Sequence, residues 1–184
     1  MHGPKAELFK GLERCAIIAE DLGVIDDGVR KLLKDTGYPG MKVFEFAFDG
    51  NPENEYLPTQ YNTNSVAYTG THDNDTLRSF ILSMNKTERR AFEKVFEEQC
   101  LQMETPYLCE TIEEECESVI RLLMASKADT VIIPMHDIVC FGAEARLNAP
   151  STVTGNNWTF RYTDKDFKRL VSAKLKAMTE EYDR

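Results

Sequence analysis

Four short apolar runs stand out along the chain and predict β-strands. They are Cys15–Ala19, Met41–Phe48, Ser65–Thr69 and Thr130–Pro134. The first and the last are continuously apolar rather than alternating, which is typical of strands covered on both faces in a parallel sheet. The pattern therefore predicts a buried parallel sheet of about four strands.

Helical patterns lie between and around these runs. Apolar residues at helical spacing predict a helix over Lys5–Arg14. Residues that commonly cap helices mark four further helix starts, at Asp26, Asn85, Thr111 and Thr163. Two of these starts carry the reciprocal capping pattern, in which a Glu follows three residues after the cap. Gly37 predicts the end of the helix that begins near Asp26.

The order of these elements predicts an α/β fold with a helical insertion between the third and fourth strands. Residues 1–184 fit a single domain, and we find no internal repeat. The segments 48–65 and 140–162 are rich in turn-forming residues and lack apolar periodicity, so we expect long ordered loops there.

Charge and composition exclude several classes of protein. The formal net charge is −9, from 31 acidic and 22 basic residues, which disfavours binding to nucleic acid or to an anionic membrane surface. No apolar run approaches the length of a membrane-spanning helix. The five cysteines are odd in number and form no closely spaced pair, as expected for reduced thiols. With no apolar signal region behind Met1, these features predict a cytoplasmic protein.

Two carboxylates follow predicted strands and are the strongest chemical signal. Glu20 comes directly after Cys15–Ala19, and Asp73 follows Ser65–Thr69. If the strands are parallel, both acids face the same end of the sheet. Two carboxylates converging on one cleft are the arrangement of glycoside chemistry, in which one acid protonates a leaving oxygen and another stays ionised.

Other residues in the same regions suit a sugar ligand. The aromatic rings of Tyr61 and Trp158 lie in the long loops and could stack on sugar rings, and Asn74 could bind hydroxyl groups. Two other interpretations remain open at this point. The run His72–Asp75 could bind Mg²⁺ or phosphate, or its polar side chains could serve only as caps and local hydrogen bonds.

Five collinear segments resemble the 4-α-glucanotransferase family, also known as amylomaltase or disproportionating enzyme. The segments are Ile17–Val24, Gly37–Phe48, Tyr68–Thr76, Ile133–Asp137 and Glu144–Pro150, the last followed by Gly155–Trp158. The match runs in order from about Lys5 to the final helix. The resemblance implies a (β/α)₈ barrel enzyme that transfers segments of α-1,4-glucan with retention and needs no cofactor or metal.

The resemblance also implies roles for individual residues. Glu20 matches the general acid/base, and Asp73 matches the carboxylate that binds sugar hydroxyls and stabilises the transition state, with His72 beside it. His136 stands where the family usually has Gln. It could donate a hydrogen bond to the sugar or only fill space, because a histidine at a strand end has no diagnostic partner in the sequence.

One part of the family's site has no counterpart. Retaining transfer needs a carboxylate nucleophile, which the family carries on the preceding strand, but upstream of Glu20 the chain has no Asp and only Glu7 and Glu13. A barrel of this type normally needs about 250 residues. We therefore expect a C-terminal portion, strands five to eight of the barrel, that is inactive alone.

One consequence of a partial barrel is expected. Exposed sheet edges would pair with a second copy or with the absent N-terminal half. The competing interpretation is a non-catalytic module or pseudoenzyme that binds α-glucan without transferring it. In either case the partner is a malto-oligosaccharide.

Overall fold

The computed structural model describes residues 3–12, 14–153, 155–167 and 169–184. Its centre is a three-stranded sheet of β1 (Gly40–Val43), β2 (Ser65–Tyr68) and β3 (Thr130–Ile132) in the order β1-β2-β3. Both neighbouring pairs are parallel. The prediction of a parallel sheet is confirmed for three of the four expected strands.

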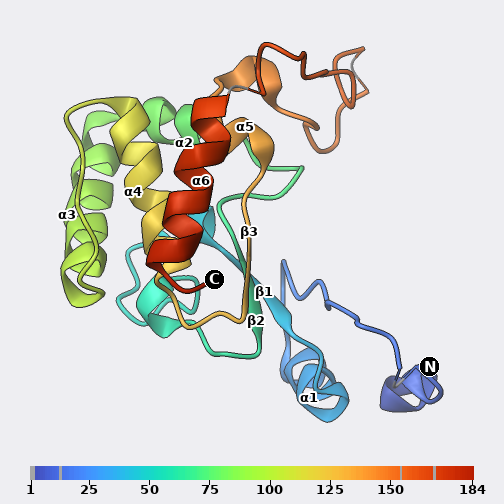
Figure 1. Ribbon diagram of the computed structural model, residues 1–184. Helices are drawn as coiled ribbons and strands as arrows, with labels where there is room; N and C mark the ends of the chain where they lie inside the picture. The colour runs from blue at the N-terminus through green and yellow to red at the C-terminus, as the bar shows by residue number, and fades with distance from the viewer. Residues whose placement is uncertain (1–2, 13, 154, 168) are drawn as a thin grey trace.

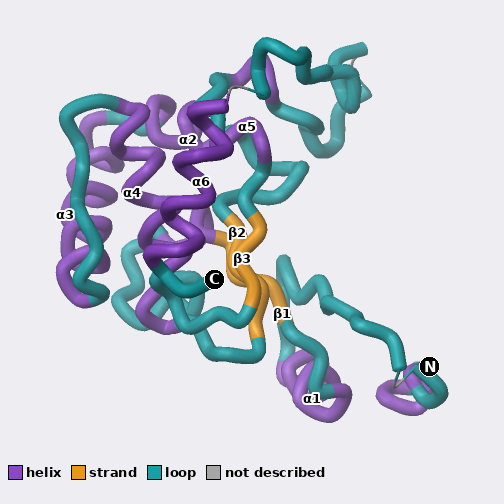
Figure 2. The backbone as a smooth tube through the Cα atoms, viewed as in Figure 1, coloured by secondary structure: helices purple, strands orange, loops and turns teal. Residues whose placement is uncertain are grey.

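Helices pack on one side of this sheet. They are α2 (Leu77–Ser83), α3 (Lys86–Gln102), α4 (Ile112–Met124) and α6 (Arg169–Glu181), whereas α1 (Asp27–Thr36) lies apart from them with the N-terminal segment (Figure 1). The short helix α5 (Met135–Ile138) follows β3 directly. The tube in Figure 2 shows the strands between these two groups, with the loop of residues 141–162 extending away from the carboxyl ends of the strands.

Local capping explains why most helices begin where the sequence predicts. The Asp26 side chain accepts a hydrogen bond from the Val29 amide, and Gly37 ends α1 with a φ of 68°, a conformation that favours glycine. Reciprocal capping boxes open α3 at Asn85 and α4 at Thr111. These predictions are confirmed, because each cap needs only residues within one turn of chain.

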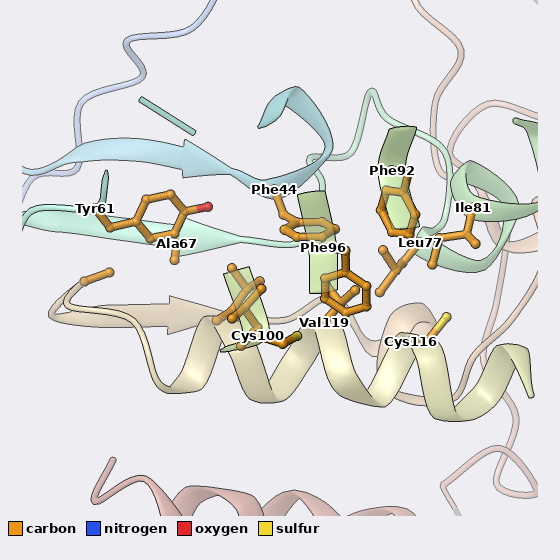
Figure 3. Close-up of a cluster of buried hydrophobic side chains, with 13 residues drawn as sticks. Phe44, Tyr61, Ala67, Leu77, Ile81, Phe92, Phe96, Cys100, Cys116 and Val119 are labelled. Atoms are coloured by element: carbon orange, nitrogen blue, oxygen red, sulfur yellow. The ribbon is translucent and has the colours of Figure 1, made fainter. Parts of the chain in front are cut away.

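The hydrophobic core joins the sheet to the helical layer. Side chains from β2, α2, α3 and α4 form one buried cluster (Figure 3), whose members include Phe44, Leu77, Phe92, Phe96 and Leu122. The Phe92 and Phe96 rings stack 5.4 Å apart, and the Phe44 ring meets both edge-on. Aromatic pairs of this geometry add about 0.5–1.5 kcal/mol each to the free energy gained by burial.

The opposite face of the sheet is less well covered. The register aligns Val43 with Tyr68 and Tyr68 with Ile132, so these three side chains share the face turned away from Ala67 and the core. Ile132 is 41% exposed on this face.

One expected strand does not form in the structure. The run Cys15–Ala19 forms no strand, and most of its side chains are exposed. Its one backbone bond to the neighbouring segment is from the Ala19 amide to the Pro39 carbonyl. An apolar run becomes a strand only where a neighbouring strand supplies a ladder of hydrogen bonds, and here that ladder is lacking. The four-stranded expectation is therefore wrong for the described residues.

The second strand and the first helix are shorter than expected. Met41–Phe48 ends its ladder at Val43 and continues as a 3₁₀ turn over Phe44–Ala47, because Phe44 turns into the core. The first helix is a 3₁₀ helix over Lys5–Phe9 that buries no side chain, and position 13 of the predicted range lies outside the described residues.

The helices after β2 and at the C-terminus also differ in detail. Helix α2, capped by Thr76, was not predicted, so three helices rather than two lie between β2 and β3. Asp166 accepts hydrogen bonds from Thr163 in a local turn, and α6 begins only at Arg169. None of the helices in the described part of the chain is long and apolar enough to cross a membrane.

Candidate functional site

The carboxyl ends of the three strands bring together polar residues from distant parts of the sequence. β1 leads into the turn that carries Glu45, β2 leads into the loop of residues 69–76, and β3 leads into α5 with His136 and Asp137. Because parallel strands end at the same edge, these groups meet there. This edge is where α/β enzymes hold their reactive groups.

Asp137 fixes both ends of the 69–76 loop. Its carboxylate accepts a hydrogen bond of 2.5 Å from the Thr69 hydroxyl, at the start of the loop, and one of 2.8 Å from the Leu77 amide, just after its end. Asp137 is 2% exposed and Thr69 is fully buried. A single buried carboxylate therefore anchors the segment that carries His72 and Asp73.

Glu45 holds the middle of the same loop through Asn74. The Asn74 amide donates to Glu45 Oε2 at 3.0 Å, and Asn74 Oδ1 accepts from the amide and the hydroxyl of Thr71. Gly70 lies close to this carboxylate, since a Cβ at that position would lie 2.9 Å from Glu45 Oε1. The Asn74 side chain thus links Glu45 to Thr71 within the protein, and these hydrogen bonds give it a structural role in the loop.

Burial changes the acidity of both anchoring carboxyl groups. It raises the pKa of Glu45 to about 8, and the neighbouring charge of Asp137 adds to this effect. Burial also raises the pKa of Asp137, against the lowering effect of the nearby His136. Raised pKa values in a polar group at a strand edge are typical of functional sites.

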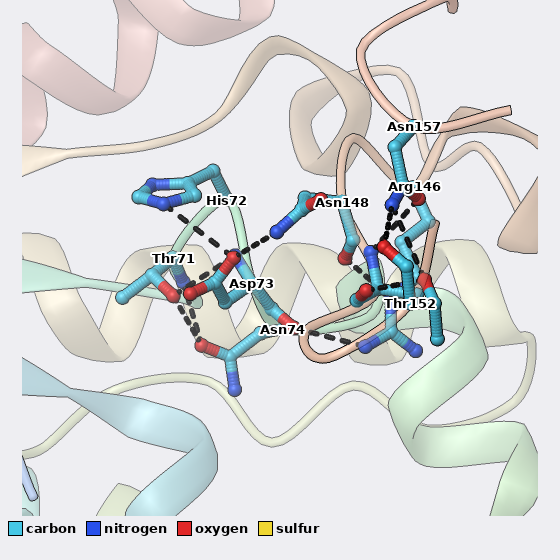
Figure 4. A network of polar contacts seen from close by, with 9 residues as sticks. Thr71, His72, Asp73, Asn74, Arg146, Asn148, Thr152 and Asn157 are labelled. Atoms are coloured by element: carbon cyan, nitrogen blue, oxygen red, sulfur yellow. Dashed lines mark hydrogen bonds and ion pairs between the residues drawn. The ribbon is translucent and has the colours of Figure 1, made fainter. Parts of the chain in front are cut away.

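Asp73 lies at the surface of this group and is bound by a second loop (Figure 4). Asn148 Nδ2 donates to Asp73 Oδ1 at 2.6 Å, and Arg146 donates to the Asp73 carbonyl at 2.9 Å. Arg146 also approaches the Asp75 carboxylate at 3.7 Å. The Asp73 side chain keeps nearly half of its surface exposed, so its second oxygen remains accessible to a ligand.

His72 and Trp158 form an aromatic pair beside Asp73. Their ring centroids lie 5.2 Å apart at an angle of 39°, and His72 Nε2 is 3.5 Å from Asp73 Oδ1. Trp158 is 54% exposed, although its amide bonds to the Leu147 carbonyl. A large ring that is held in place yet exposed is suited to stacking on an apolar sugar face.

His136 occupies an interior position. It is 5% exposed, its Nε2 is 3.7 Å from Asp137, and its Nδ1 is within 3.3 Å of the Tyr162 hydroxyl. Among the described residues these two neighbours account for both ring nitrogens. Of the two roles that the sequence leaves open, the burial favours a packing role that supports Asp137.

Glu20 is not brought into this group. Its side chain is exposed and makes no hydrogen bond or ion pair within the described part of the chain. The adjacent Asp21 instead accepts a 2.7 Å hydrogen bond from the Met41 amide at the start of β1. The structure therefore joins Asp73, His72, Asn74 and Trp158 in one region and leaves Glu20 outside it.

Tyr61 also lies elsewhere. It precedes β2, at the amino end of the strand, and is 2% exposed within the hydrophobic core. Its ring has no surface available to a ligand, which contradicts the expectation of sugar stacking. An aromatic residue in a loop can pack into the hydrophobic core, and the local sequence does not show whether it does.

Four residues of the site were missed in the sequence: Glu45, Asp137, Arg146 and Asn148. All four lie within the segments that resemble the family, so the sequence motifs that contain them could be recognised. Their hydrogen-bond partners could not be recognised, because Asp137 and Leu77 are 60 positions apart and Asn148 and Asp73 are 75 positions apart. A recess of about 480 Å³ lies beside Arg146 and Asn148.

Known proteins match the chain over nearly its whole length. The family model for 4-alpha-glucanotransferase matches residues 3–167. The chain is 39% identical to a 4-alpha-glucanotransferase of Clostridium butyricum, over 99% of this chain and 36% of that protein. It is also 39% identical to the chloroplastic/amyloplastic 4-alpha-glucanotransferase DPE1 of Arabidopsis thaliana, over 99% of this chain and 31% of that protein.

Solved structures give the same picture. The amylomaltase of Streptococcus agalactiae, solved in complex with acarbose, superposes with a TM-score of 0.83 at 33% identity, covering all of this chain and 36% of that one. The amylomaltase of Corynebacterium glutamicum matches in fold, with a TM-score of 0.63 at 14% identity, covering 88% of this chain and 27% of that one. The chain spans about a third of the length of the curated relatives that it matches.

Proposed function

The chain belongs to the 4-alpha-glucanotransferase family, and from that premise we propose that it supplies part of an active site that transfers α-1,4-glucan segments between oligosaccharides. The observation that carries the proposal is the placement of Asp73. Its carboxylate is held by Asn148 at 2.6 Å beside the exposed ring of Trp158, at the carboxyl edge of a parallel sheet.

In the proposed reaction the chain contributes two carboxylates. Glu20 protonates the oxygen of the departing glucan and later takes the proton from the acceptor hydroxyl. Asp73 binds sugar hydroxyls and stabilises the positive charge that develops in the transition state. His72 and Trp158 position the sugar, and the carboxylate nucleophile is supplied from outside this chain.

The proposed fold is a half of a (β/α)₈ barrel. The parallel order β1-β2-β3 and the site at the carboxyl edge support it. In a closed barrel the face of Tyr68 and Ile132 would point inward, which agrees with the 41% exposure of Ile132. That face and the sheet edges would pair with the rest of the barrel or with a second copy, and size-exclusion chromatography at several concentrations tests for the second copy.

A second candidate applies to the chain alone: binding of malto-oligosaccharide without transfer. The observation that favours it is the separation of Glu20, which has no partner among the described residues, from the assembled group around Asp73. We propose that the 184-residue chain alone is inactive and that a cytoplasmic glucan is the ligand of the whole protein.

The decisive experiment is a chimaera. The matching third of the Clostridium butyricum relative is replaced by this chain, and glucose release from maltotriose is measured. We expect transfer by the chimaera and none by the chain alone. Asp73→Asn and Glu20→Gln should each reduce kcat of the chimaera by at least about 100-fold.

Asp129→Asn is the matched control, since Asp129 is exposed and far from the carboxyl edge in the register. It should leave transfer unchanged. Full activity of the Asp73→Asn chimaera would refute the proposed role, and glucose release by the chain alone would refute its inactivity. Titration of the chain with maltoheptaose, followed by the fluorescence of its single tryptophan, tests the binding candidate separately.

A further inference from the structure

Two cysteines meet behind the site, on the side of the sheet where the helices pack. Cys116 lies in the middle of α4 and is 1% exposed, and Cys140 follows α5 and is half-buried. The Cys116 and Cys140 side chains interact with one another, and both line the same small cavity. The two side chains are therefore neighbours in the fold, although the residues are 24 positions apart in the sequence.

A cation approaches the same sulfur. Arg78 Nη1 donates to Cys140 Sγ at 3.7 Å and is itself held by Glu113 at 2.6 Å. A positive charge and a donated hydrogen bond both favour the thiolate, which is the nucleophilic form of cysteine. Arg78, Glu113 and Cys140 have no part in the proposed glucan-transfer chemistry.

The environments of the two sulfurs give them different acidities. The hydrogen bond from Cys116, with Arg78 adding to it, lowers the pKa of Cys140 to about 7. The bond to Cys140 and its burial raise the pKa of Cys116 well above the usual range. Near neutral pH the pair thus holds one thiolate and one thiol, the arrangement of an attacking and a resolving cysteine.

A small cavity gives access to the pair. It has a volume of about 190 Å³ and is lined by both cysteines, by Lys174 on α6 and by Glu113, Glu117 and Asp137. The charged groups that surround the sulfurs in the described structure are Arg78, Lys174, Glu113, Glu115, Glu117 and Asp137. Cys140 is half-buried and therefore the more accessible of the two, whereas Cys116 is 1% exposed.

We propose that Cys140 is an oxidisable thiol that is captured by small disulfides such as glutathione disulfide and is then resolved by Cys116 into an intrachain disulfide. The Cys140 thiolate attacks one sulfur of glutathione disulfide, which forms a mixed disulfide and releases a glutathione thiolate. The Cys116 sulfur then attacks Cys140, and the second glutathione leaves with the proton of Cys116. Two protein thiols are oxidised and one glutathione disulfide is reduced to two thiols.

The bond would tie α4 to the segment that carries Asp137. The Cys140 amide already donates to the Asp137 carbonyl at 3.1 Å, and the Asp137 carboxylate anchors the 69–76 loop. Oxidation therefore fixes the turn behind the candidate site. This thiol chemistry does not depend on whether the chain takes part in glucan transfer.

The test is oxidation of the full chain with glutathione disulfide near pH 7, followed by non-reducing digestion and mass spectrometry. Trypsin alone leaves Cys100, Cys109 and Cys116 on one peptide between Lys94 and Arg121, so a glutamate-specific protease is added to separate them. We expect a peptide that links Cys116 to Cys140 and the loss of two hydrogen atoms from the intact mass. Disulfides that join Cys15 or Cys109 instead would overturn the proposal.

Variants separate the two steps. Cys116→Ser should stop at a mixed disulfide on Cys140, and Cys140→Ser should leave Cys116 unmodified. Arg78→Gln should slow capture of Cys140 by about tenfold through loss of the cation, while Arg89→Gln, whose charge pairs with Glu93 and Glu115 instead, should not. Equal rates for both arginine variants would contradict the role of Arg78.

The pH dependence of alkylation gives an independent measurement on the unmodified chain. Reaction of Cys140 with iodoacetamide should rise with a midpoint near pH 7, where the lowered pKa of Cys140 lies. A midpoint near the ordinary thiol value of about 8.5 would overturn the assignment of Cys140 as the attacking cysteine.

Discussion

The loop that carries Asp73 and the segment that carries Glu20 are both expected at strand ends, but the structure holds them very differently. The Asp73 loop is bound by carboxylates from the ends of two neighbouring strands and by a second loop through Asn148. The Glu20 segment is held near β1 by a backbone bond at Ala19 and by the side chain of Asp21. A strand-end position creates a site only when neighbouring strands supply partners.

The same difference appears in burial. The groups that anchor the Asp73 loop are enclosed, with Asp137 2% exposed and Thr69 fully buried. On the Glu20 segment Ile18 is 47% exposed and no side chain reaches the core cluster. We infer that the Asp73 loop is preorganised in this chain, whereas the Glu20 segment needs a further neighbour to fix its acid.

Replacement of Asp137 is the strongest way to break this comparison. Asp137→Ala leaves the Leu77 amide and the Thr69 hydroxyl without partners in a buried position, so we expect a loss of about 3–5 kcal/mol in the free energy of unfolding. Urea denaturation followed by circular dichroism measures it.

Glu20→Ala is the matched control for that measurement. Glu20 is exposed and makes no hydrogen bond or ion pair within the described residues, so the free energy of unfolding should change by less than about 0.5 kcal/mol. Similar losses for both variants would show that the two regions are equally anchored.

A more gradual effect is expected from pH through Glu45. Its pKa is raised to about 8 in the folded chain, so the folded state holds a proton that the unfolded state loses above about pH 4.5. The contribution of Glu45 to stability is therefore complete below pH 4.5 and is lost as the pH rises toward 8, by at most about 1.4 kcal/mol per pH unit.

Glu45→Gln should remove this slope because glutamine does not ionise. Urea unfolding at intervals from pH 5 to 8 compares the two proteins, and Glu53→Gln, an exposed site on the adjoining loop, serves as control. A slope that persists unchanged in Glu45→Gln would assign the titration to another group, with Asp137 the next to test.

The smallest effect is expected where the two loops meet. Asn148→Ala removes the 2.6 Å bond to Asp73, which is partly exposed, so about 1 kcal/mol should be lost. The fluorescence of Trp158 should also change, because the bond holds its loop near His72. Asn62→Ala, exposed and distant from the tryptophan, should leave the emission spectrum as it is.

The sequence alone determined two kinds of feature. One is local structure such as helix caps, and the other is family membership, which depends on a match along most of the chain. The caps at Asp26, Asn85 and Thr111 are confirmed because each is complete within four residues of chain. The family was recognised because several collinear segments agree at once, and the family model confirms it. The carboxylate roles assigned to Glu20 and Asp73 remain predictions that the chimaera tests.

What only the tertiary structure decided depends on residues distant in the chain. The apolar run Cys15–Ala19 forms no strand because no neighbouring strand pairs with it. Tyr61 packs in the hydrophobic core and is not accessible to a ligand. Asp137 anchors a loop more than 60 positions away, and Cys140 meets Cys116 beneath it. Strand pairing and burial need partners that a local pattern does not contain, which is why these features appear only in the folded chain.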